Sequence, residues 1–483
     1  MAQSLVLVTV DCLRSDHVGF MGYARPTTPI LDSLARDACV FSQAIVAGAP
    51  TYYSFPAMLA SRYPLALGRD VVGLAPGEHS LALVLQQSGY ATAAFNAGNP
   101  YLSAHFGYDQ GFDVFRDFLD VKLPSVQEEG SPTTRTRWNQ RFNKMSHRLG
   151  LGELYEELYF QYAQRRTSAP ESFEPLRRFP AADVIVDEAA SWIQTIQGRP
   201  FFLWIHLMDP HAPYYPAQEA LGFMGDGDIT PRRALYLNQY WNRRELPARR
   251  LQRYKREIVR LYDAGIRWVD MQMGRLLETL KSVNAWDDCL LVFTADHGEE
   301  FLEHEGRFHP QWTAKEELIH VPLFMRLPKG SATHTTDAVF SHVDLGPTLL
   351  DAMSVPLPDA FQGRSRLGDL RSGKSWDEAV IVDCTESINP NRPDDRLRPR
   401  VLCVRDRRYK LTIRFGSQQE ELFDLENDLG ETNPLPLSAA TGIRRRLLEH
   451  AHRHLSRTPA PEQLKSRMSA RIRNFQMDAR PRS

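Results

Sequence analysis

Two short runs of apolar residues along the chain end abruptly in acidic residues. Residues 5–10 are aliphatic apart from one threonine, are rich in β-branched side chains, and are followed at once by Asp11. Far downstream, residues 289–295 repeat the pattern and lead into Asp296 and His297. A run of this length without a polar face is typical of a strand buried on both sides in a parallel α/β sheet. Because ligand sites in such sheets lie beyond the carboxyl ends of strands, the pattern predicts a ligand beside Asp11 and Asp296.

Helical and strand-like patterns alternate between these two runs. Apolar runs predict further strands over 91–95 and 201–207, and an apolar position every three or four residues predicts a long helix over 256–280. A helix is expected over 181–196, and another helix is expected to start within 55–67. This alternation predicts an α/β fold with a large mixed, mostly parallel sheet sandwiched by helices.

The pattern changes after residue 363. Short strands are expected over 380–384, 400–405 and 409–413, which predicts a small antiparallel sheet. We therefore expect a main domain, a C-terminal subdomain, and a basic helix and tail. Their predicted ranges are 1–363, with helical insertions at about 121–180 and 217–255, then 364–435 and 436–483.

Composition excludes several classes of protein. The 483 residues carry 58 Lys and Arg against 59 Asp and Glu, so there is no overall charge that would attract nucleic acid. No apolar run is long enough to span a membrane, and the first strand begins almost at Met1 without a leader segment. The five cysteines are scattered and form no zinc-binding spacing. These features favour a cytoplasmic protein with reduced thiols.

The residues at the strand ends suit a divalent cation. Carboxylate oxygens and an imidazole are hard and borderline ligands, which bind such ions in proteins. A single Asp after a strand is often the N-cap of the following helix instead. Two strand ends of this kind, the second followed by His297, favour the metal interpretation over the capping one.

Seven segments in order resemble the sulfatase branch of the alkaline phosphatase superfamily. The resemblance runs from about Leu5 to Glu431 and rests on these segments: DCLRSDHVGF, TTPILDSLARDACVF, SFPAMLASRYP, GFDVF, MDPHAPY, TADHGEEF and IHVPL. It implies a sulfatase-like catalytic domain over 1–363 and the small C-terminal sheet of that family. In the family, the nucleophile precedes the arginine of the ASRYP-like segment by about ten residues, which places it at Thr51.

Threonine at this position departs from the family's sulfatase pattern. Sulfate-ester hydrolases of the family usually have a Cys or Ser in a C/S-x-P-x-R motif that is oxidised to formylglycine. Here the segment reads TYYSF, without the Cys, the Pro or the Arg. The secondary alcohol of threonine cannot give an aldehyde, so no formylglycine is expected if Thr51 is the nucleophile. A metal-activated threonine resembles the phosphodiesterase and phosphotransferase relatives. Ser54 is the competing nucleophile.

The resemblance implies one metal site, formed by Asp11, Thr51, Asp296 and His297. Cys12 stands where formylglycine sulfatases have a second Asp, and His297 where they often have Asn. Fewer carboxylates and an imidazole favour Mn²⁺ or Zn²⁺, with Ca²⁺ and Mg²⁺ as the alternatives. Cys12 is either a soft ligand or a small buried residue, and we favour the second interpretation.

Three further residues are expected to contact the substrate. His211 lies in the MDPHAPY segment, and His309 stands where many sulfatases carry a substrate-binding lysine. Both are candidate contacts of the ester and candidate acids for the leaving group. Asn99 is a candidate donor to a non-bridging oxygen, as in threonine-nucleophile relatives.

The sequence therefore predicts a metal-dependent sulfatase-like hydrolase or transferase that cleaves phosphodiester or phosphonate esters through Thr51. Its substrate is expected to be a small-molecule, glycan or lipid ester. One alternative is a sulfuric ester hydrolase without formylglycine. Another is a catalytically inactive binding protein of the same fold. The sequence leaves the oligomeric state and the organic part of the substrate open.

Overall fold

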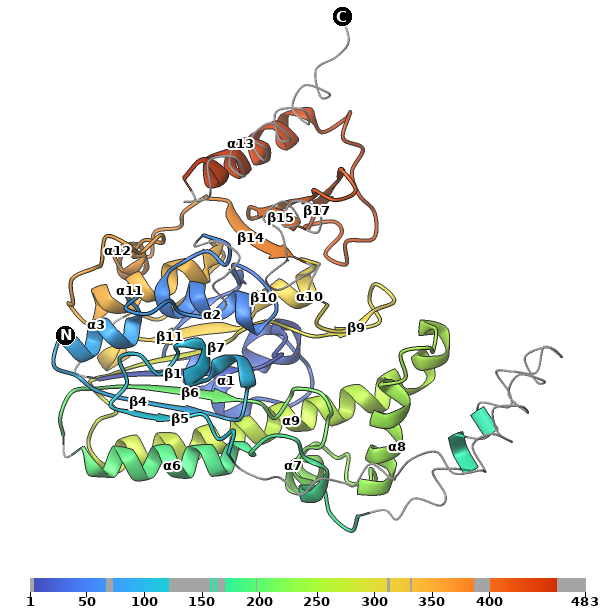
Figure 1. Ribbon diagram of the computed structural model, residues 1–483, viewed down its shortest axis with the longest axis horizontal. Coiled ribbons are helices and arrows are strands. Elements are labelled where there is room, and N and C mark those ends of the chain that lie inside the picture. Colours follow the sequence, from blue (N-terminus) through green and yellow to red (C-terminus); the bar gives the residue numbers. More distant parts are fainter. Residues whose placement is uncertain are drawn as a thin grey trace, which may run out of the picture.

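The computed structural model describes residues 4–66, 73–120, 157–158, 160–162, 170–196, 198–310, 313–330, 332–385 and 400–457. Its centre is an eight-stranded sheet with the order β12-β2-β11-β7-β1-β6-β4-β5 (Figure 1). The strands β1 (Ser4–Val10), β6 (Phe201–Leu207) and β7 (Cys289–Ala295) lie in the middle, parallel to one another and buried along their whole lengths. Such burial on both faces is what their uninterrupted apolar runs predict.

The sheet is parallel on one side and mixed on the other. Beyond β6, the strands β4 (Ala91–Asn96) and β5 (Val114–Arg116) continue the parallel arrangement. Beyond β7, β11 (Leu323–Arg326) runs antiparallel to it. The edge on this side is formed by β2 (Cys39–Phe41) and β12 (His334–Thr336), which pair in parallel.

Helices cover both faces of this sheet (Figure 1). The long α9 (Ala248–Ser282) packs with α6 (Ala182–Thr195) and α1 (Pro29–Ala35). The opposite face carries α2 (Thr51–Ala60) and α11 (Leu345–Ala352). Five further helices among the described residues precede the C-terminal sheet: α3 (Leu81–Gln87), α7 (Gln218–Phe223), α8 (Pro231–Trp241), α10 (Glu316–Ile319) and α12 (Leu367–Ser372).

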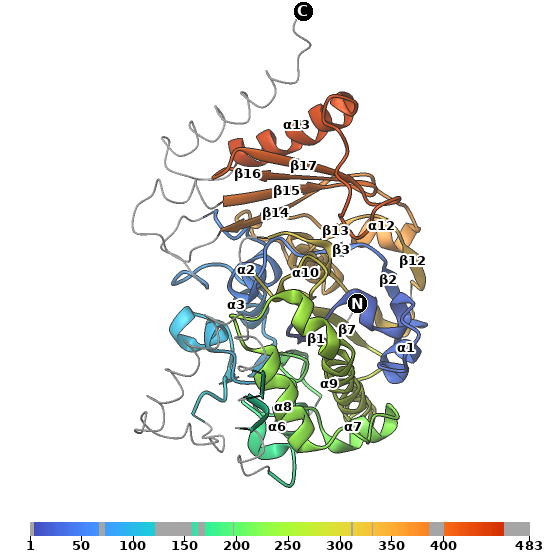
Figure 2. The same ribbon diagram turned by 90° about the vertical axis from the view of Figure 1, so that its right-hand side faces the viewer.

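A four-stranded antiparallel sheet follows near the C-terminus. It consists of β14 (Val380–Thr385), β15 (Arg400–Arg405), β16 (Tyr409–Arg414) and β17 (Gln419–Asp424). The helix α13 (Thr441–Arg457) covers its outer face (Figure 2). Two small sheets complete the described structure, β10-β3-β13 (His320–Val321, Ala44–Ile45, Phe340–Ser341) and β8-β9 (Glu300–Phe301, Arg307–Phe308). The predicted fold class is confirmed.

Some predicted bounds were wrong. The helix expected to start within 55–67 begins at Thr51 and ends at Ala60, because Ser61 turns into the left-handed region with φ 48°. The long helix begins at Ala248 rather than at residue 256. Four of its first eight residues are basic, but Leu251 is buried and continues the apolar repeat that predicted the helix. The predicted insertion at 121–180 lies largely outside the described residues, and that at 217–255 contains α7 and α8. The domain boundaries stay a prediction.

Two further expectations concern the membrane and the cysteines. Among the described residues, no helix has the length and apolar character needed to cross a membrane. All five cysteines are buried and unpaired. All five thiols therefore lie in the interior of the protein as small buried side chains.

Candidate active site

The register of the central strands brings the two acidic strand ends together. Val10 of β1 lies opposite Leu207 of β6 and Ala295 of β7, so Asp11 and Asp296 follow their strands at the same edge of the sheet. Both side chains are fully buried. Two buried carboxylates at one sheet edge require compensation, because burial without a partner disfavours the charged form strongly.

Asp11 is held by an amide, an imidazole and a thiol. Its Oδ2 accepts a 2.8 Å hydrogen bond from Asn99 Nδ2 and lies 3.3 Å from His206 Nε2. Its Oδ1 accepts from Cys12 Sγ at 3.0 Å. Asn99, predicted to contact a substrate oxygen, thus lies at the predicted site but donates to Asp11 in this structure. It orients the carboxylate as well as lining the site.

One carboxylate oxygen of Asp296 accepts hydrogen bonds, and the other has no hydrogen-bond partner among the described residues. Its Oδ1 accepts from the backbone N–H groups of His297 (2.9 Å) and Cys12 (3.3 Å). Its Oδ2 is buried without a hydrogen-bond partner. A buried carboxylate oxygen of this kind is costly unless something else binds it.

Thr51 is the first residue of α2 and faces the same cluster. Its Oγ1 lies 3.3 Å from His297 Nε2. The Nδ1 of His297 is 2.8 Å from the carbonyl of Gly298, which only accepts, so Nδ1 carries the proton and the lone pair of Nε2 faces Thr51. The N-terminus of a helix also favours an anion through its dipole and free N–H groups.

These four residues fit a divalent cation. His297 Nε2 lies 3.3 Å from Thr51 Oγ1, 3.5 Å from Asp296 Oδ2 and 3.8 Å from Asp11 Oδ1. Ligands about 2.0–2.2 Å from a tetrahedral ion are roughly 3.3–3.6 Å apart, so the observed separations need little adjustment. The orphaned Asp296 Oδ2 and the free Nε2 lone pair point to the same conclusion. Asp11, Thr51, Asp296 and His297 would hold the ion.

His211 and His309 lie at the solvent side of this cluster. Their rings are 5.2 Å apart, and that of His309 is 4.7 Å from the ring of His297. Both are partly exposed, whereas the four residues above are buried. A carboxylate anchors His309, because Glu299 Oε2 lies 3.0 Å from its Nδ1 and the hydroxyl of Tyr214 donates to Glu299 Oε1 at 2.6 Å. The two imidazoles are therefore placed where an ester would arrive.

The buried groups titrate far from their ordinary ranges. Burial, followed by the charge of Asp11, raises the pKa of Asp296 to about 8. Burial, followed by the charge of His309, lowers the pKa of His297 to about 4, which keeps its imidazole neutral as a metal ligand requires. Burial disfavours the charge on His309, but the Glu299 carboxylate outweighs it and raises the pKa of His309.

Sequence reasoning missed His206, Glu299 and Tyr214. His206 lies opposite Thr9 in the parallel pair of β1 and β6, and its Nδ1 is 3.0 Å from Thr9 Oγ1. The only signal was a single histidine in an otherwise apolar strand. Glu299 belongs to the Asp296–Glu299 segment, but its role depends on contacts with His309, ten residues on, and with Tyr214, 85 residues away, which the segment itself does not reveal.

The residues that replace the formylglycine motif are buried. Phe55, at the position of the motif's arginine, packs 5.3 Å from Trp204 and 5.2 Å from His206, ring centre to ring centre. Ser54, the competing nucleophile, is fully buried, and its Oγ has no hydrogen-bond partner among the described residues. Thr51, by contrast, lies 3.3 Å from His297 Nε2, at the cluster of candidate metal ligands.

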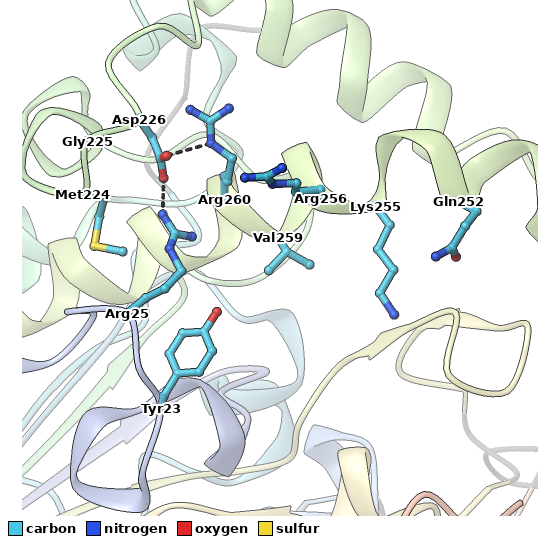
Figure 3. A pocket seen from close by; sticks show the side chains of 10 residues that line it. All are labelled: Tyr23, Arg25, Met224, Gly225, Asp226, Gln252, Lys255, Arg256, Val259 and Arg260. Atoms are coloured by element: carbon cyan, nitrogen blue, oxygen red, sulfur yellow. Dashed lines mark hydrogen bonds and ion pairs between the residues drawn. The ribbon is translucent and has the colours of Figure 1, made fainter.

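A separate pocket of about 790 Å³ lies between α7, α9 and the loop before α1 (Figure 3). None of the site residues lines it. Arg25 pairs there with Asp226 and Asp263, and Arg260 with Asp226 and Asp228, so these cations are already neutralised. This pocket therefore does not resemble the cluster of Asp11, Asp296 and His297 at the strand ends.

The chain is similar to known proteins in sequence and in fold. Residues 3–355 match the Sulfatase family, and residues 303–454 match the family described as N-sulphoglucosamine sulphohydrolase, C-terminal. An arylsulfatase of Clostridium perfringens is 23% identical over 90% of each chain. The crystal structure of a phosphonate monoester hydrolase of Agrobacterium radiobacter is 20% identical, covers 96% of each chain and superposes with a TM-score of 0.61. A structure in complex with its substrate D-glucosamine-2-N,6-O-disulfate is 17% identical over 98% of this chain and 99% of the other, with a TM-score of 0.67.

The chain thus has the fold of ester hydrolases of the alkaline phosphatase superfamily. Within that superfamily, it belongs to the sulfatase family. Members of this family typically depend on a metal ion, which agrees with the ligand set at the sheet edge.

Proposed function

We propose that this sulfatase-family hydrolase cleaves phosphodiester or phosphonate monoesters with Thr51 as the nucleophile. The observation that carries the proposal is the position of Thr51 Oγ1, at a helix N-terminus and 3.3 Å from the free nitrogen of His297. A threonine at this position cannot become formylglycine, because its β-carbon bears a methyl group. An attack by the hydroxyl itself is then the remaining chemistry for residue 51.

A bound cation would lower the pKa of the Thr51 hydroxyl and neutralise charge on the ester. Thr51 Oγ, after losing its proton to solvent, attacks phosphorus in line with the leaving oxygen, and the bond to that oxygen breaks as the new P–O bond forms. His309, kept protonated by Glu299, donates its proton to the leaving oxygen, and His211 contacts a non-bridging oxygen. The intermediate is an ester of Thr51 with the remaining phosphate ester or phosphonate. A second in-line attack on it, by water or by another alcohol that gives its proton to His309, breaks the P–O bond to Thr51 and releases the threonine.

The charge of the substrate does not separate sulfate from phosphodiester, since both carry one negative charge. What separates the two substrates is how the covalent intermediate breaks down. A sulfated formylglycine collapses by elimination, but a sulfated threonine needs a second attack at sulfur. A phosphate or phosphonate ester of threonine is resolved by in-line displacement at phosphorus. Threonine therefore favours a phosphorus ester, and the relatives named as phosphonate monoester hydrolases act on such esters.

A sulfuric ester hydrolase without formylglycine is the second candidate, favoured by the relative named as an arylsulfatase. Matched aryl esters separate the two. With one leaving group, we expect the phosphodiester or phosphonate monoester to exceed the sulfate in kcat/KM by at least about tenfold, or about 1.4 kcal/mol. Faster turnover of the sulfate would overturn the phosphorus-ester proposal. Turnover of none of the three esters by metal-loaded enzyme would favour an inactive binding protein.

Three variants at two positions of α2 test the nucleophile. Thr51→Ala should lose at least about 10³-fold in turnover, or about 4 kcal/mol of transition-state stabilisation, whereas Thr51→Ser should retain part of it. Ser54→Ala is the matched control and should keep turnover near wild type. The reverse pattern would assign the nucleophile to Ser54.

A further inference from the structure

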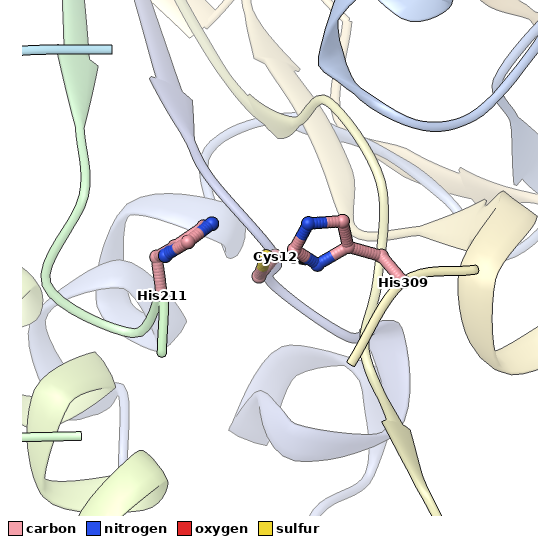
Figure 4. Close-up of side chains that lie close together, drawn as sticks. All are labelled: Cys12, His211 and His309. Atoms are coloured by element: carbon pink, nitrogen blue, oxygen red, sulfur yellow. Dashed lines mark hydrogen bonds between the residues drawn. The ribbon is translucent and has the colours of Figure 1, made fainter. Parts of the chain in front are cut away.

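A phenylalanine borders the active site beside His211. Phe179 lies in the segment before α6, and its ring centre is 5.2 Å from that of His211, with the two rings nearly perpendicular at 81°. The ring of His211 in turn lies 5.2 Å from that of His309, and Figure 4 shows these two imidazoles facing one another across Cys12. Phe179 and His211 are both partly exposed. The phenyl ring is therefore next to the histidines that an ester would meet.

The absence of a side chain at Gly98 lets this segment approach the site. A β-carbon at Gly98 would lie 3.3 Å from Pro180 Cδ and 3.9 Å from Phe179 Cδ1, and the φ of this residue is +75°, which favours glycine. The next residue in the chain is Asn99, which lines the site. Phe179 therefore lies against the backbone that carries Asn99 as well as against His211.

The proposed reaction decides which part of an ester meets this ring. During in-line attack the leaving oxygen lies opposite Thr51 Oγ, and the non-bridging oxygens and the retained substituent lie around phosphorus between the two. In that reaction His211 contacts a non-bridging oxygen, whereas His309 protonates the leaving oxygen. A ring packed on His211 is then beside the retained substituent rather than beside the leaving group.

We propose that Phe179 binds the retained organic group of the ester, and that this group is an aromatic or other apolar ring. The inference rests on the proposed function for the identity of the reacting atoms. A phenyl ring binds another ring by burying apolar surface, at centre-to-centre distances of about 4.5–7 Å, and it offers no N–H or O–H donor to an oxygen.

The chemistry of the retained group separates the ester classes at this position. A sulfate monoester has only oxygens around sulfur besides its leaving group, so it presents no carbon group to Phe179. A phosphonate monoester or a phosphodiester has an organic substituent there, which stays bonded to phosphorus through both displacements. An apolar ring at this position is therefore useful to a phosphorus ester and not to a sulfate monoester.

Two phosphonate esters with the same leaving group test this contact in the full-length, metal-loaded enzyme. They are the para-nitrophenyl esters of phenylphosphonate and of methylphosphonate, and the measured quantity is the phenyl-to-methyl ratio of kcat/KM. Phe179→Ala should lower this ratio by at least about threefold relative to wild type, which is the scale of one aromatic pair. Comparing the ratio between two enzymes cancels the intrinsic reactivity of the esters.

A merely structural role of Phe179 would affect both substrates alike. If Phe179 only held His211 in place, Phe179→Ala would lower kcat/KM for both esters by the same factor, and an unchanged ratio would overturn the proposal. Phe179→Tyr keeps the aromatic ring and should keep the ratio within about twofold of wild type.

Phe20→Ala is the matched control. Phe20 is also partly exposed, and its ring meets that of Phe324 nearly perpendicularly at 5.5 Å, on β11 rather than beside His211. This variant should keep the wild-type ratio. A ratio that falls equally in Phe20→Ala and Phe179→Ala would contradict a specific contact with Phe179.

The outcome is separable from that of the proposed function. If Thr51→Ala is inactive while wild type and Phe179→Ala have the same ratio, the Phe179 contact is wrong and the threonine nucleophile stands. If the metal-loaded enzyme turns over neither phosphonate ester, the proposed function fails, and calorimetric binding of phenylphosphonate and methylphosphonate still tests the contact. Wild type should then prefer phenylphosphonate more strongly than Phe179→Ala does, and equal preference in the two proteins would overturn the proposal.

Discussion

Two clusters of buried charge in this protein are compensated in opposite ways. Where the C-terminal sheet meets the main domain, the fully buried Lys410 Nζ lies 3.1 Å from Glu316 Oε1 and 3.0 Å from Glu431 Oε2. Arg405 adds a second cation 3.3 Å from Glu316. At the active site, in the part of the chain that the structure describes, Asp11 and Asp296 form ion pairs only with histidines.

This difference indicates what each cluster is for. The acids at the C-terminal junction find their cations within the chain, so the cluster is complete when the protein folds. The acids of the active site are brought together without Lys or Arg, so histidines and neutral hydrogen-bond donors compensate them in part and a bound cation would offset the rest of the cost. The first cluster joins two parts of the fold, and the second fits an ion.

The largest expected effect on stability comes from removing the cation at the junction. Lys410→Met leaves Arg405 beside Glu316 and only Lys315, 3.9 Å away, beside Glu431, and should lower the free energy of unfolding by about 3–5 kcal/mol in urea denaturation. The matched control is Arg408→Met on the same sheet, because Arg408 pairs with Asp424 but its side chain is 45% exposed. The control should lose less than about 1 kcal/mol. Equal losses in the two variants would contradict the junction's role.

The next effect is the stabilisation of the folded chain by metal. At a free metal concentration about 100 times the dissociation constant, wild type should gain about 2.7 kcal/mol over the metal-free protein. Asp296→Asn should gain almost nothing and should carry less metal by elemental analysis. Its metal-free stability should be no lower than that of wild type, because the change removes a buried carboxyl that must take up a proton for the chain to fold. A full metal response in Asp296→Asn would show that the ion binds elsewhere.

The third expected effect is smaller. The active-site cluster and the junction cluster should change the free energy of unfolding over different pH ranges. In the metal-free protein, burial beside Asp11 raises the pKa of Asp296 to about 8, so this carboxyl holds a proton in the folded state that the unfolded chain releases. Stability should therefore fall as the pH rises toward 8. Burial lowers the pKa of His297 to about 4, so His297 has the opposite effect, but only below its ordinary pKa of about 6.5.

Between about pH 6.5 and 8, the pH dependence of stability therefore reports on Asp296 and not on His297. Metal-free wild type should lose on the order of 1 kcal/mol per pH unit there relative to Asp296→Asn, measured by urea denaturation at each pH. Parallel pH profiles of the two proteins would contradict this. At the junction, burial would raise the pKa of Glu316, but Arg405 and Lys410 outweigh it and lower that pKa, so stability is lost only as the pH falls below the ordinary range of glutamate.

The contrast also explains what could be predicted from the sequence. Asp11 and Asp296 were predictable because each follows a strand that is apolar throughout, and parallel neighbours end at one edge. His206 was not, because a histidine inside a strand carries no sign of the Thr9 contact that orients it. The junction was beyond prediction, since Lys410 and Glu316 are 94 residues apart and meet only when the two sheets pack together.

The family resemblance supplied what local patterns could not. It located Thr51 by its distance from a later segment, although the helix was expected to start within 55–67. The start at Thr51 is difficult to see in the sequence, because tyrosines occupy the first turn and Pro56 lies inside the helix.

The most direct test of the central claim is to find the ester's phosphorus on Thr51. Metal-loaded enzyme would be mixed with an aryl phosphonate monoester, quenched in acid and digested with trypsin. Residues 37–62 then form one peptide, which contains both Thr51 and Ser54. We predict that fragmentation places the phosphonyl group on Thr51 and that Thr51→Ala shows no adduct. An adduct on Ser54, or one that persists in Thr51→Ala, would contradict the account.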